Sequence, residues 1–346
     1  MKKIMLDPSP SFKTLILPKY GSSESNNDKI KNNFRYCSSG KSALASILAY
    51  LRYSGVLKDK MSTVLVPQWI GYEVYKTMTE YCFPTLKKDS DPKVMIVYHQ
   101  YGFPQDMERI LEYSDSKKII LIEDCAHALD SNYKDNRVGS FGDFSIYSFS
   151  KFVYCHALGG VGFKDSEFSH FFQDRFNDSS RAMVSVINAI KLLSMNNNVS
   201  WTNKILSVKF TNGLTKMSYS RYGDVLRPSN SSIGLYESKI NKEKELRKYI
   251  YKRIRDSLSI YGLVDHLEES GVIPYAIPLM VPADKSEKLV SVLKDNNFET
   301  GVYFFDLNRF MLEPDFVKTV LIPCHSGISD NNLDKLIGLI KTIINN

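Results

Sequence analysis

The chain has 346 residues, of which 43% are hydrophobic and 24% charged, a composition that excludes disordered, collagen-like and coiled-coil proteins. The length is enough for about two folding units, no apolar run reaches the ~20 residues that span a bilayer, and the first residues lack a signal-peptide core, so we expect a soluble, cytoplasmic protein with no membrane partner. The formal net charge of +7, without a dense Lys/Arg tract, favours a solvated basic surface or anionic small substrates over nucleic-acid binding.

The first third of the chain alternates between helical and strand patterns. Apolar residues at helical spacing predict a helix over 41–51, with serines at its start. Short apolar runs at 63–67, 94–98 and 119–122 predict strands that are covered on both faces, and a further helix is predicted over 105–113. This order of elements predicts a mostly parallel sheet layered by helices.

The rest of the chain predicts a second, smaller domain. The predicted elements are helices over 183–195, 240–258 and 286–295, strand-like residues 273–281, and a final helix that begins near Ser329. We therefore expect a large α/β domain over 1–232 and a small C-terminal α+β domain over 233–346.

Cysteine and histidine usage narrows the class of protein further. Five scattered cysteines without a C-x-x-C pair indicate free thiols in a reducing compartment. The six histidines form no H-x-x-x-H pattern and no cluster with cysteine, so we predict no metal site.

A glycine–lysine–serine turn opens the first predicted helix. Gly40-Lys41-Ser42 suggests a nucleotide-binding P-loop, but the position five residues before Gly40 is Arg35 rather than glycine, which excludes that pattern. Small residues and backbone N–H groups at a helix N-terminus still attract an anionic phosphate. For this motif alone, plain helix capping by serine is the favoured explanation.

Two further motifs place reactive groups at the ends of strands. Asp124 follows a buried strand, at the edge where open α/β sheets bind ligands, and His127 comes one turn later. The Asp124 carboxylate could hold a cationic ring nitrogen, or it could simply cap the next segment. Lys151 leaves an aromatic-rich strand, and burial there would lower the pKa of the amine, as a nucleophile requires. A surface lysine with a buried stem is the alternative.

Together these motifs provide what pyridoxal phosphate (PLP) needs from a protein. Lys151 would hold the aldehyde as a Schiff base, and Asp124 would keep the ring nitrogen protonated. The remaining cofactor-binding candidates are the phosphate donors Gly40, Lys41, Ser42 and Ser148, and the ring-covering aromatic residues Trp69 or Tyr72.

Several stretches of the chain are similar to motifs of one protein family. They are S-G-K-S-A-L at 39–44, H-Q-Y-G at 99–102, E-D-C-A-H-A at 123–128, V-G-S-F-G-D at 138–143 with S-F at 148–149, and L-I-P-C-H at 321–325 followed by I-S-D at 328–330. The chain thereby resembles the DegT/StrS-type sugar aminotransferases, which have the fold-type-I architecture of PLP-dependent transferases. The resemblance implies that Asp124 meets the pyridine nitrogen, that His127 lies near the ring hydroxyl and that Ser148 binds phosphate.

Three positions depart from the pattern of that family. Lys41 stands where threonine is usual, so a cation replaces one hydroxyl donor. Lys151 fits the shorter S-F-x-K form that some members use, whereas the commonest form would place the lysine at Val153. The loop that reaches the neighbouring subunit's phosphate is changed to V-L-R-P-S at 225–229, which keeps Arg227 and lacks the asparagine.

The resemblance implies a homodimeric aminotransferase that moves an amino group from glutamate to a keto group of a nucleotide-linked deoxysugar, for surface polysaccharide or related glycan biosynthesis. Lys151 would be the catalytic residue, and the substrate would enter between the two domains. Three alternatives stay open: a PLP-dependent keto-sugar dehydratase, in which histidine replaces the lysine and for which His156 lies nearby; an aminotransferase for another small phosphorylated ketone; and a non-catalytic binding protein on the same fold.

Overall fold

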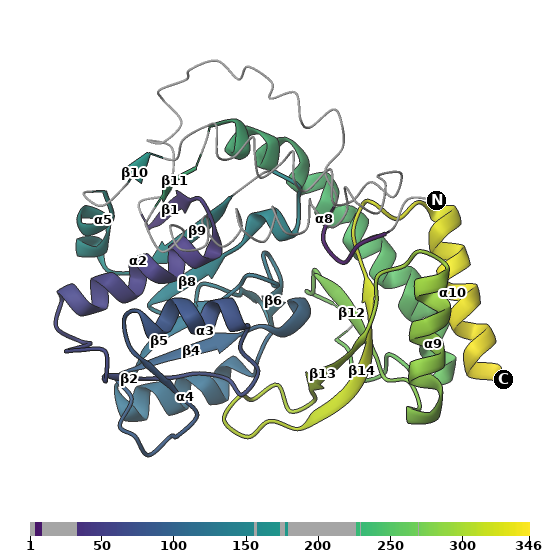
Figure 1. The fold of residues 1–346 in the computed structure, drawn as a ribbon, viewed down its shortest axis with the longest axis horizontal. Coiled ribbons are helices and arrows are strands. Elements are labelled where there is room, and N and C mark those ends of the chain that lie inside the picture. Colours follow the sequence, from purple (N-terminus) through teal and green to yellow (C-terminus); the bar gives the residue numbers. More distant parts are fainter. Residues whose placement is uncertain are drawn as a thin grey trace, which may run out of the picture.

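A seven-stranded sheet forms the centre of the larger unit of the molecule (Figure 1). The computed structural model describes residues 4–8, 33–155, 158–173, 177–178, 226–228, 230–268 and 270–346. The strands are β1 (Phe34–Cys37), β2 (Thr63–Leu65), β3 (Phe83–Thr85), β4 (Val94–Tyr98), β5 (Ile120–Asp124), β8 (Phe144–Tyr147) and β9 (Gly159–Phe163). In the order β1-β9-β8-β5-β4-β2-β3, all neighbours from β8 to β3 pair in parallel, and β9 pairs antiparallel with both β8 and β1. The sheet is mostly parallel, as predicted.

Helices cover both faces of this sheet. They are α2 (Gly40–Tyr53), α3 (Tyr72–Thr79), α4 (Met107–Lys117) and α5 (Ser166–Gln173). Val94 and Ile96 of β4 pack in one core with residues of α2 and α5, whereas Met95 and Val97 pack in another core with residues of α4. Because successive side chains of a strand point to opposite faces, an all-apolar strand such as β4 must be covered on both sides.

The smaller unit is built on a three-stranded antiparallel sheet in the order β12-β14-β13. Its elements are β12 (Ala276–Leu279), β13 (Val302–Asp306), β14 (Phe316–Pro323), α8 (Asn230–Leu258), α9 (Ala283–Asp295) and α10 (Asp330–Asn345). Figure 1 shows α8 running from the larger unit to the smaller one. Residues 4–8 lie against the smaller unit, because the Ile4 N–H donates to the Asn297 carbonyl (2.8 Å) and the Ile4 carbonyl accepts from the Glu299 N–H (2.7 Å).

Short elements complete the described part of the chain. They are β6 (Asn132–Tyr133), β7 (Asn136–Arg137), β10 (Asn177–Asp178), β11 (Leu226–Arg227) and the 3-10 helices η1 (Gln100–Gly102), η2 (Phe149–Lys151) and η3 (Ser259–Tyr261). Among the described helices, none combines the length and apolar character needed to cross a lipid bilayer.

Most predicted elements are present, with shifted boundaries. The helix predicted over 240–258 begins earlier, at Asn230, and Ser329 caps α10, where its side chain accepts from the Asn332 N–H. The strand β3 was not predicted, because its three residues, F-P-T, are too few to show a periodic pattern and lie at the edge of the sheet. The predicted domain boundary at 232/233 falls in the first turn of α8 and stays a prediction.

Candidate active site

Lys151 and His127 meet at the edge where the parallel strands of the large sheet end. Lys151 closes η2 directly after β8, and His127 follows the end of β5. The Lys151 Nζ lies 2.8 Å from the His127 Nε2. Surrounding atoms enclose both side chains, although part of each surface remains accessible. This desolvation lowers the pKa of Lys151, against the opposing charges of Asp124 and Asp7, and lowers the pKa of His127 well below its usual 6.5.

Asp124 ends β5 beside this pair. Its Oδ1 accepts a hydrogen bond from the Ala126 N–H (2.9 Å), and the described residues supply no further hydrogen bond to this carboxylate. Burial raises the pKa of Asp124, while the bond from Ala126 and the charges of Lys151 and His99 lower it. A cationic ring nitrogen placed here would stabilise the ionised carboxylate, so Asp124 and Lys151 together fit PLP.

The start of α2 packs directly against the end of β8. A Cβ atom at Gly40 would lie 3.3 Å from the Ser148 Cβ, and one at Gly159 would lie 2.2 Å from the Ser39 carbonyl carbon, so only glycine allows this close approach of β9. Ser39 caps α2 and accepts a hydrogen bond from the Ser42 N–H (3.1 Å). The predicted phosphate donors Gly40 and Ser148 are therefore neighbours.

Ser42 and Lys41 already have partners in the protein. The buried Ser42 hydroxyl lies 2.9 Å from the Ser38 Oγ and accepts from the Ser39 Oγ at 3.2 Å, so the favoured capping explanation accounts for it. The Lys41 Nζ lies 3.5 Å from a carboxylate oxygen of Glu73 in α3. Burial lowers the pKa of Lys41. The negative charge of Glu73 raises this pKa, and the positive charge of Lys151 lowers it further. The phosphate role of both residues stays a prediction.

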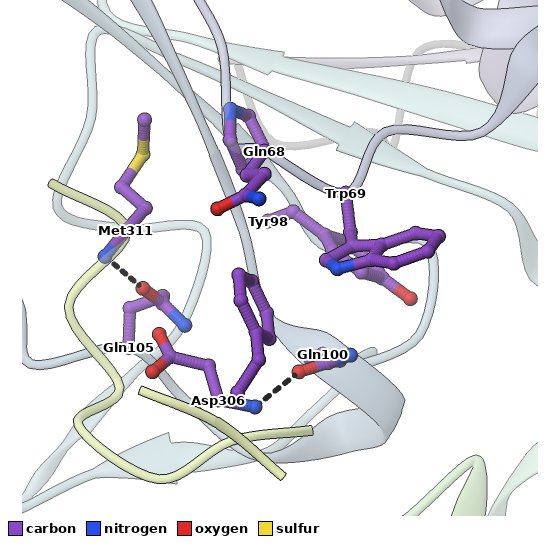
Figure 2. Close-up of a pocket in the computed structure, with 9 residues that line it drawn as sticks. Gln68, Trp69, Tyr98, Gln100, Gln105, Asp306 and Met311 are labelled. Carbon is purple, nitrogen blue, oxygen red and sulfur yellow. Dashed lines mark hydrogen bonds between the residues drawn. The ribbon is translucent and has the colours of Figure 1, made fainter. Parts of the chain in front are cut away.

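The two aromatic candidates differ in their surroundings. Trp69 is 49% exposed and stacks on Phe304 of β13, with ring centroids 5.2 Å apart, whereas Tyr72 is 73% exposed at the start of α3. Trp69 also lines a small pocket between the two units, together with Tyr98 (Figure 2). Since Tyr98 contacts His127, Trp69 is the candidate connected to the site. Which ring covers a cofactor stays a prediction.

The small unit is held across this pocket by Gln100. Its Oε1 accepts from the Asp306 N–H (3.0 Å; Figure 2). Its Nε2 donates to the Phe304 carbonyl (2.6 Å), so one amide side chain bonds the edge of β13 twice. The side chain of Gln105 bonds the loop that follows β13, since its Oε1 accepts from the Met311 N–H (2.9 Å).

His127 is held by residues that the sequence analysis did not single out. The Tyr98 hydroxyl contacts its Nδ1. The Tyr275 ring stacks on it with a centroid distance of 4.1 Å and an interplanar angle of 3°, and the Tyr275 hydroxyl donates to the Asp7 Oδ1 (2.7 Å). Tyr98 could have been predicted as a site residue, because it directly precedes the H-Q-Y-G motif. The contact of Asp7 could not, because Asp7 lies 268 positions from Tyr275 in the chain.

Arg247 of α8 is a second residue that was missed. It is fully buried, its Nε donates to the Glu243 Oε1 (2.8 Å), and its Nη1 donates to the carbonyls of Pro274 (2.9 Å) and Tyr275 (3.0 Å). Its Nη2 reaches the carbonyl of Phe152, which directly follows Lys151, at 3.4 Å. One guanidinium therefore joins α8 to both sides of the site.

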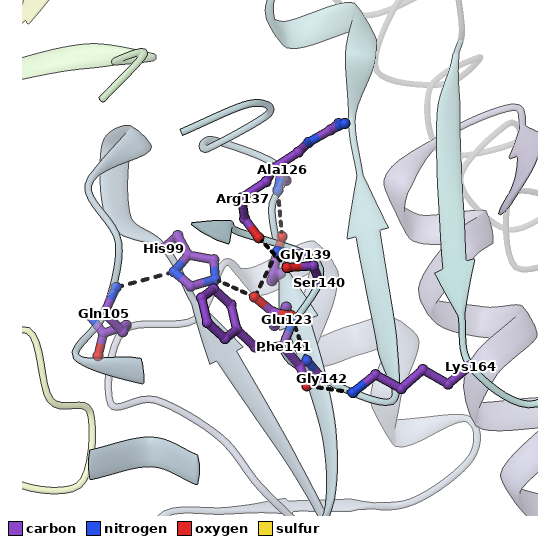
Figure 3. A network of polar contacts seen from close by, with 11 residues as sticks. His99, Gln105, Glu123, Ala126, Arg137, Gly139, Ser140, Phe141, Gly142 and Lys164 are labelled. Carbon is purple, nitrogen blue, oxygen red and sulfur yellow. Dashed lines mark hydrogen bonds and ion pairs between the residues drawn. The ribbon is translucent and has the colours of Figure 1, made fainter. Parts of the chain in front are cut away.

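Glu123 links two of the sequence motifs (Figure 3). Its carboxylate accepts from the N–H groups of Gly139 (2.7 Å), Phe141 (2.8 Å) and Gly142 (2.6 Å), and lies 3.2 Å from the His99 Nε2. The His99 Nδ1 accepts from the Gln105 N–H (3.1 Å), so its Nε2 carries the proton toward Glu123.

Among the described residues, the side chains of His99, Glu123 and Cys125 lie close enough together to hold a metal ion. Both nitrogens of His99 and both oxygens of Glu123 are already engaged in the hydrogen bonds above. These contacts account for the cluster as a structural network.

Three sequence predictions fall outside the described residues. They concern the helix over 183–195, His156 and the side chain of Arg227, whose backbone belongs to β11.

Comparison with known proteins confirms the resemblance. Residues 85–168 match the model of the DegT/DnrJ/EryC1/StrS aminotransferase family. GDP-perosamine synthase of Escherichia coli O157:H7 is 49% identical over 57 residues, 16% of this chain and 16% of that protein. UDP-N-acetyl-3-dehydro-alpha-D-glucosamine 3-aminotransferase of Acidithiobacillus ferrooxidans is 40% identical over 57 residues, 16% of this chain and 15% of that protein. These matches span about a sixth of the length of either relative.

Solved structures extend the similarity of fold to most of the chain. Helicobacter pylori PseC, an aminotransferase involved in the biosynthesis of pseudoaminic acid, superposes with a TM-score of 0.61 at 13% identity and covers 90% of this chain and 86% of that chain. The PLP-form of Spr1654 from Streptococcus pneumoniae has a TM-score of 0.60 at 16% identity and covers 98% of this chain and 92% of that chain. The predicted fold is confirmed.

Proposed function

We propose that this chain is a member of the DegT/DnrJ/EryC1/StrS aminotransferase family and a PLP-dependent aminotransferase that acts on a nucleotide-linked keto sugar. The observation that carries the proposal is the enclosed Lys151 amine, 2.8 Å from His127 and beside Asp124 at the ends of adjacent strands. An amine with a lowered pKa, a carboxylate at the end of the neighbouring strand and a neutral imidazole are the groups that the chemistry requires.

Each of these residues has a definite task. PLP supplies an aldehyde for the amine and a ring that accepts negative charge during the reaction. The Lys151 Nζ would hold that aldehyde and, when the donor amine has taken its place, would move a proton from the substrate Cα to the reacting carbon of the cofactor. Asp124 would pair with the ring nitrogen, and His127 would lie near the ring oxygen. The start of α2, next to Ser148, would receive the phosphate.

The substrates follow from the named relatives. One is a GDP-perosamine synthase and the other a UDP-N-acetyl-3-dehydro-alpha-D-glucosamine 3-aminotransferase, so we assign a nucleotide-linked keto sugar as acceptor. Glutamate as the amino donor is the expectation from the sequence resemblance and is part of the proposal. The pocket between the two units, with amide, carboxylate and aromatic groups, is where the acceptor enters. A homodimer that works in the cytoplasm, on the way to a surface polysaccharide or related glycan, completes the proposal.

Borohydride reduction of the PLP-loaded protein, followed by peptide mapping, tests the assignment of Lys151. We expect a reduced pyridoxyl group on Lys151, and we expect Lys151→Ala to lose about 10²- to 10⁴-fold in transaminase turnover. Lys164→Ala is the matched control, since Lys164 is exposed and its Nζ bonds the Phe141 carbonyl, away from the site. Full turnover in Lys151→Ala would contradict the assignment.

A screen of keto-sugar nucleotides tests the substrate class. Each is supplied with glutamate, and release of 2-oxoglutarate is followed. Release with a nucleotide-linked keto sugar, and none with small phosphorylated ketones, is expected. The opposite preference would overturn the acceptor assignment while leaving the aminotransferase intact.

A further inference from the structure

The pocket between the two units carries a negative charge without a positive one (Figure 2). Among the described residues that line it, Asp306 is the only charged residue, and no lysine, arginine or histidine is present. Aromatic side chains, those of Trp69 and Phe316, form part of the wall. A phosphate or carboxylate group would be repelled here, whereas a neutral molecule that carries hydroxyl groups fits these walls.

The carboxylate of Asp306 uses one of its two oxygens within the protein. Asp306 ends β13 and is 3% exposed. Its Oδ1 accepts from the N–H groups of Asn308 (3.1 Å) and Asp315 (2.9 Å), so this oxygen holds the loop between β13 and β14. The Oδ2 has no hydrogen-bond partner among the described residues. A buried carboxylate oxygen without a donor is unfavourable unless a ligand or water supplies one.

The amide of Gln105 offers a donor in the same pocket. Gln105 is also 3% exposed, and its Oε1 accepts from the Met311 N–H (2.9 Å). Because a backbone N–H can only donate, this bond fixes which end of the amide is oxygen and which is nitrogen. The Nε2 has no partner among the described residues, unlike the amide of Gln100, which bonds β13 with both ends. The pocket therefore holds an acceptor and a donor that the protein itself leaves unused.

Tyr98 connects this pocket to the amine of the site. It lines the pocket, and its hydroxyl contacts the Nδ1 of His127, whose Nε2 lies 2.8 Å from the Lys151 Nζ. The pocket is small, so it takes one or two groups of a ligand rather than the whole of it. A ligand that reacts near Lys151 could place such a group in the pocket.

We propose that Asp306 and Gln105 bind a ring hydroxyl of the acceptor sugar and so determine which acceptor this chain takes. A hydroxyl is donor and acceptor at one oxygen, so it can donate to the Asp306 Oδ2 and accept from the Gln105 Nε2. This role rests on the proposed function, and it places the sugar ring rather than the diphosphate at the pocket.

Calorimetric binding of nucleotide sugars to the PLP-loaded protein tests this role. UDP-glucose and GDP-mannose are each compared with the free nucleoside diphosphate and with analogues in which one ring hydroxyl is replaced by hydrogen. One analogue should bind the wild type about tenfold more weakly than its parent, because a hydrogen bond to a buried carboxylate is lost. Asp306→Asn keeps an oxygen for the loop but can turn the acceptor in the pocket into a donor. It should therefore bind the parent about tenfold more weakly and no longer distinguish that analogue.

Asp315→Asn is the matched control, because it removes the same charge from the same loop at an exposed side chain that does not line the pocket. It should bind every compound as the wild type does. If all analogues bind the wild type as tightly as their parents, the role is overturned without recourse to any variant. Tighter binding of the nucleoside diphosphate by Asp306→Asn would also overturn it, because phosphate would then lie beside Asp306. A wild type that binds neither nucleotide sugar would overturn the proposed function instead.

Discussion

At Lys151, the surroundings decide whether the amine can react. A lysine in water is protonated at pH 7 and is a poor nucleophile. Enclosure by the protein lowers the pKa of Lys151, and the carboxylates of Asp124 and Asp7 limit how far it falls. His127, whose pKa is also lowered, adds a neutral polar partner rather than a second cation. The site therefore shifts the equilibrium of Lys151 toward the neutral amine and places the Asp124 carboxylate beside it.

The charge of Asp124 is testable at this scale. Asp124→Asn keeps the shape of the side chain but removes the counter-charge, so we expect about 10²- to 10³-fold lower turnover and a changed absorbance spectrum of the bound cofactor. Asp334→Asn is a suitable control, because Asp334 forms an exposed pair with Arg253 (2.6 Å) far along the chain. Equal turnover in Asp124→Asn and wild type would mean that this carboxylate does not act on the ring nitrogen.

At the scale of elements, the pleat of β5 separates two acids that are adjacent in sequence. Successive side chains of a strand point to opposite faces, so Glu123 enters the polar network around residues 139–142 while Asp124 faces the site of Lys151. The network joins β5 to the turn before β8, which is the strand that leads to Lys151. Glu123 thus supports the site through the backbone.

Removing this support should destabilise the fold. Glu123→Ala leaves three N–H groups, one of them buried and two partly buried, and the buried His99 without their acceptor, so we expect the free energy of unfolding to fall by about 2–5 kcal/mol in chemical denaturation. Glu167→Ala, at an exposed position of α5, should change it by less than about 0.5 kcal/mol. A loss as small as that of the control would show that the turn is held by other contacts.

At the scale of the whole molecule, α8 connects the two units through its buried face. Arg247 bonds the backbone of the small unit at Pro274 and Tyr275 and reaches Phe152 in the large unit, while Glu243 neutralises it within the same helix. The N-terminal residues 4–8 add a further link, since the ring of His325 bonds the Met5 carbonyl (2.7 Å) and Asp7 reaches Tyr275. The site lies where these links meet.

Arg247→Met should therefore have a large effect on stability. It leaves the buried Glu243 carboxylate without its partner, and we expect a loss of about 3–5 kcal/mol in chemical denaturation. Lys248→Met, the next residue, is the control: its pair with Glu245 is exposed, and a change below about 1 kcal/mol is expected. The double variant Glu243→Gln/Arg247→Met should recover part of the lost free energy of unfolding, because no charge is then left unpaired. If it is as unstable as Arg247→Met alone, the unpaired charge of Glu243 is not the cause of the loss.

The layered sheet, and Asp124, His127 and Lys151 as candidates for the chemistry, could be predicted from the sequence. Apolar runs such as 94–98 can only be satisfied by cover on both faces, and Asp124, His127 and Lys151 follow strands whose ends share one edge of the sheet. These are local patterns, which a reader of one stretch of chain can recognise.

Only the tertiary structure decided what surrounds those residues. Tyr98 and Tyr275 contact His127, and Asp7 reaches Tyr275 across 268 positions of sequence, without any local pattern that marks them. Arg247 stands in a helix that is rich in charged residues, and nothing in its spacing separates a buried guanidinium from an exposed one. Burial and hydrogen-bond partners depend on which distant segments pack together, and these in turn set the charge of Lys151 and the orientation of His127.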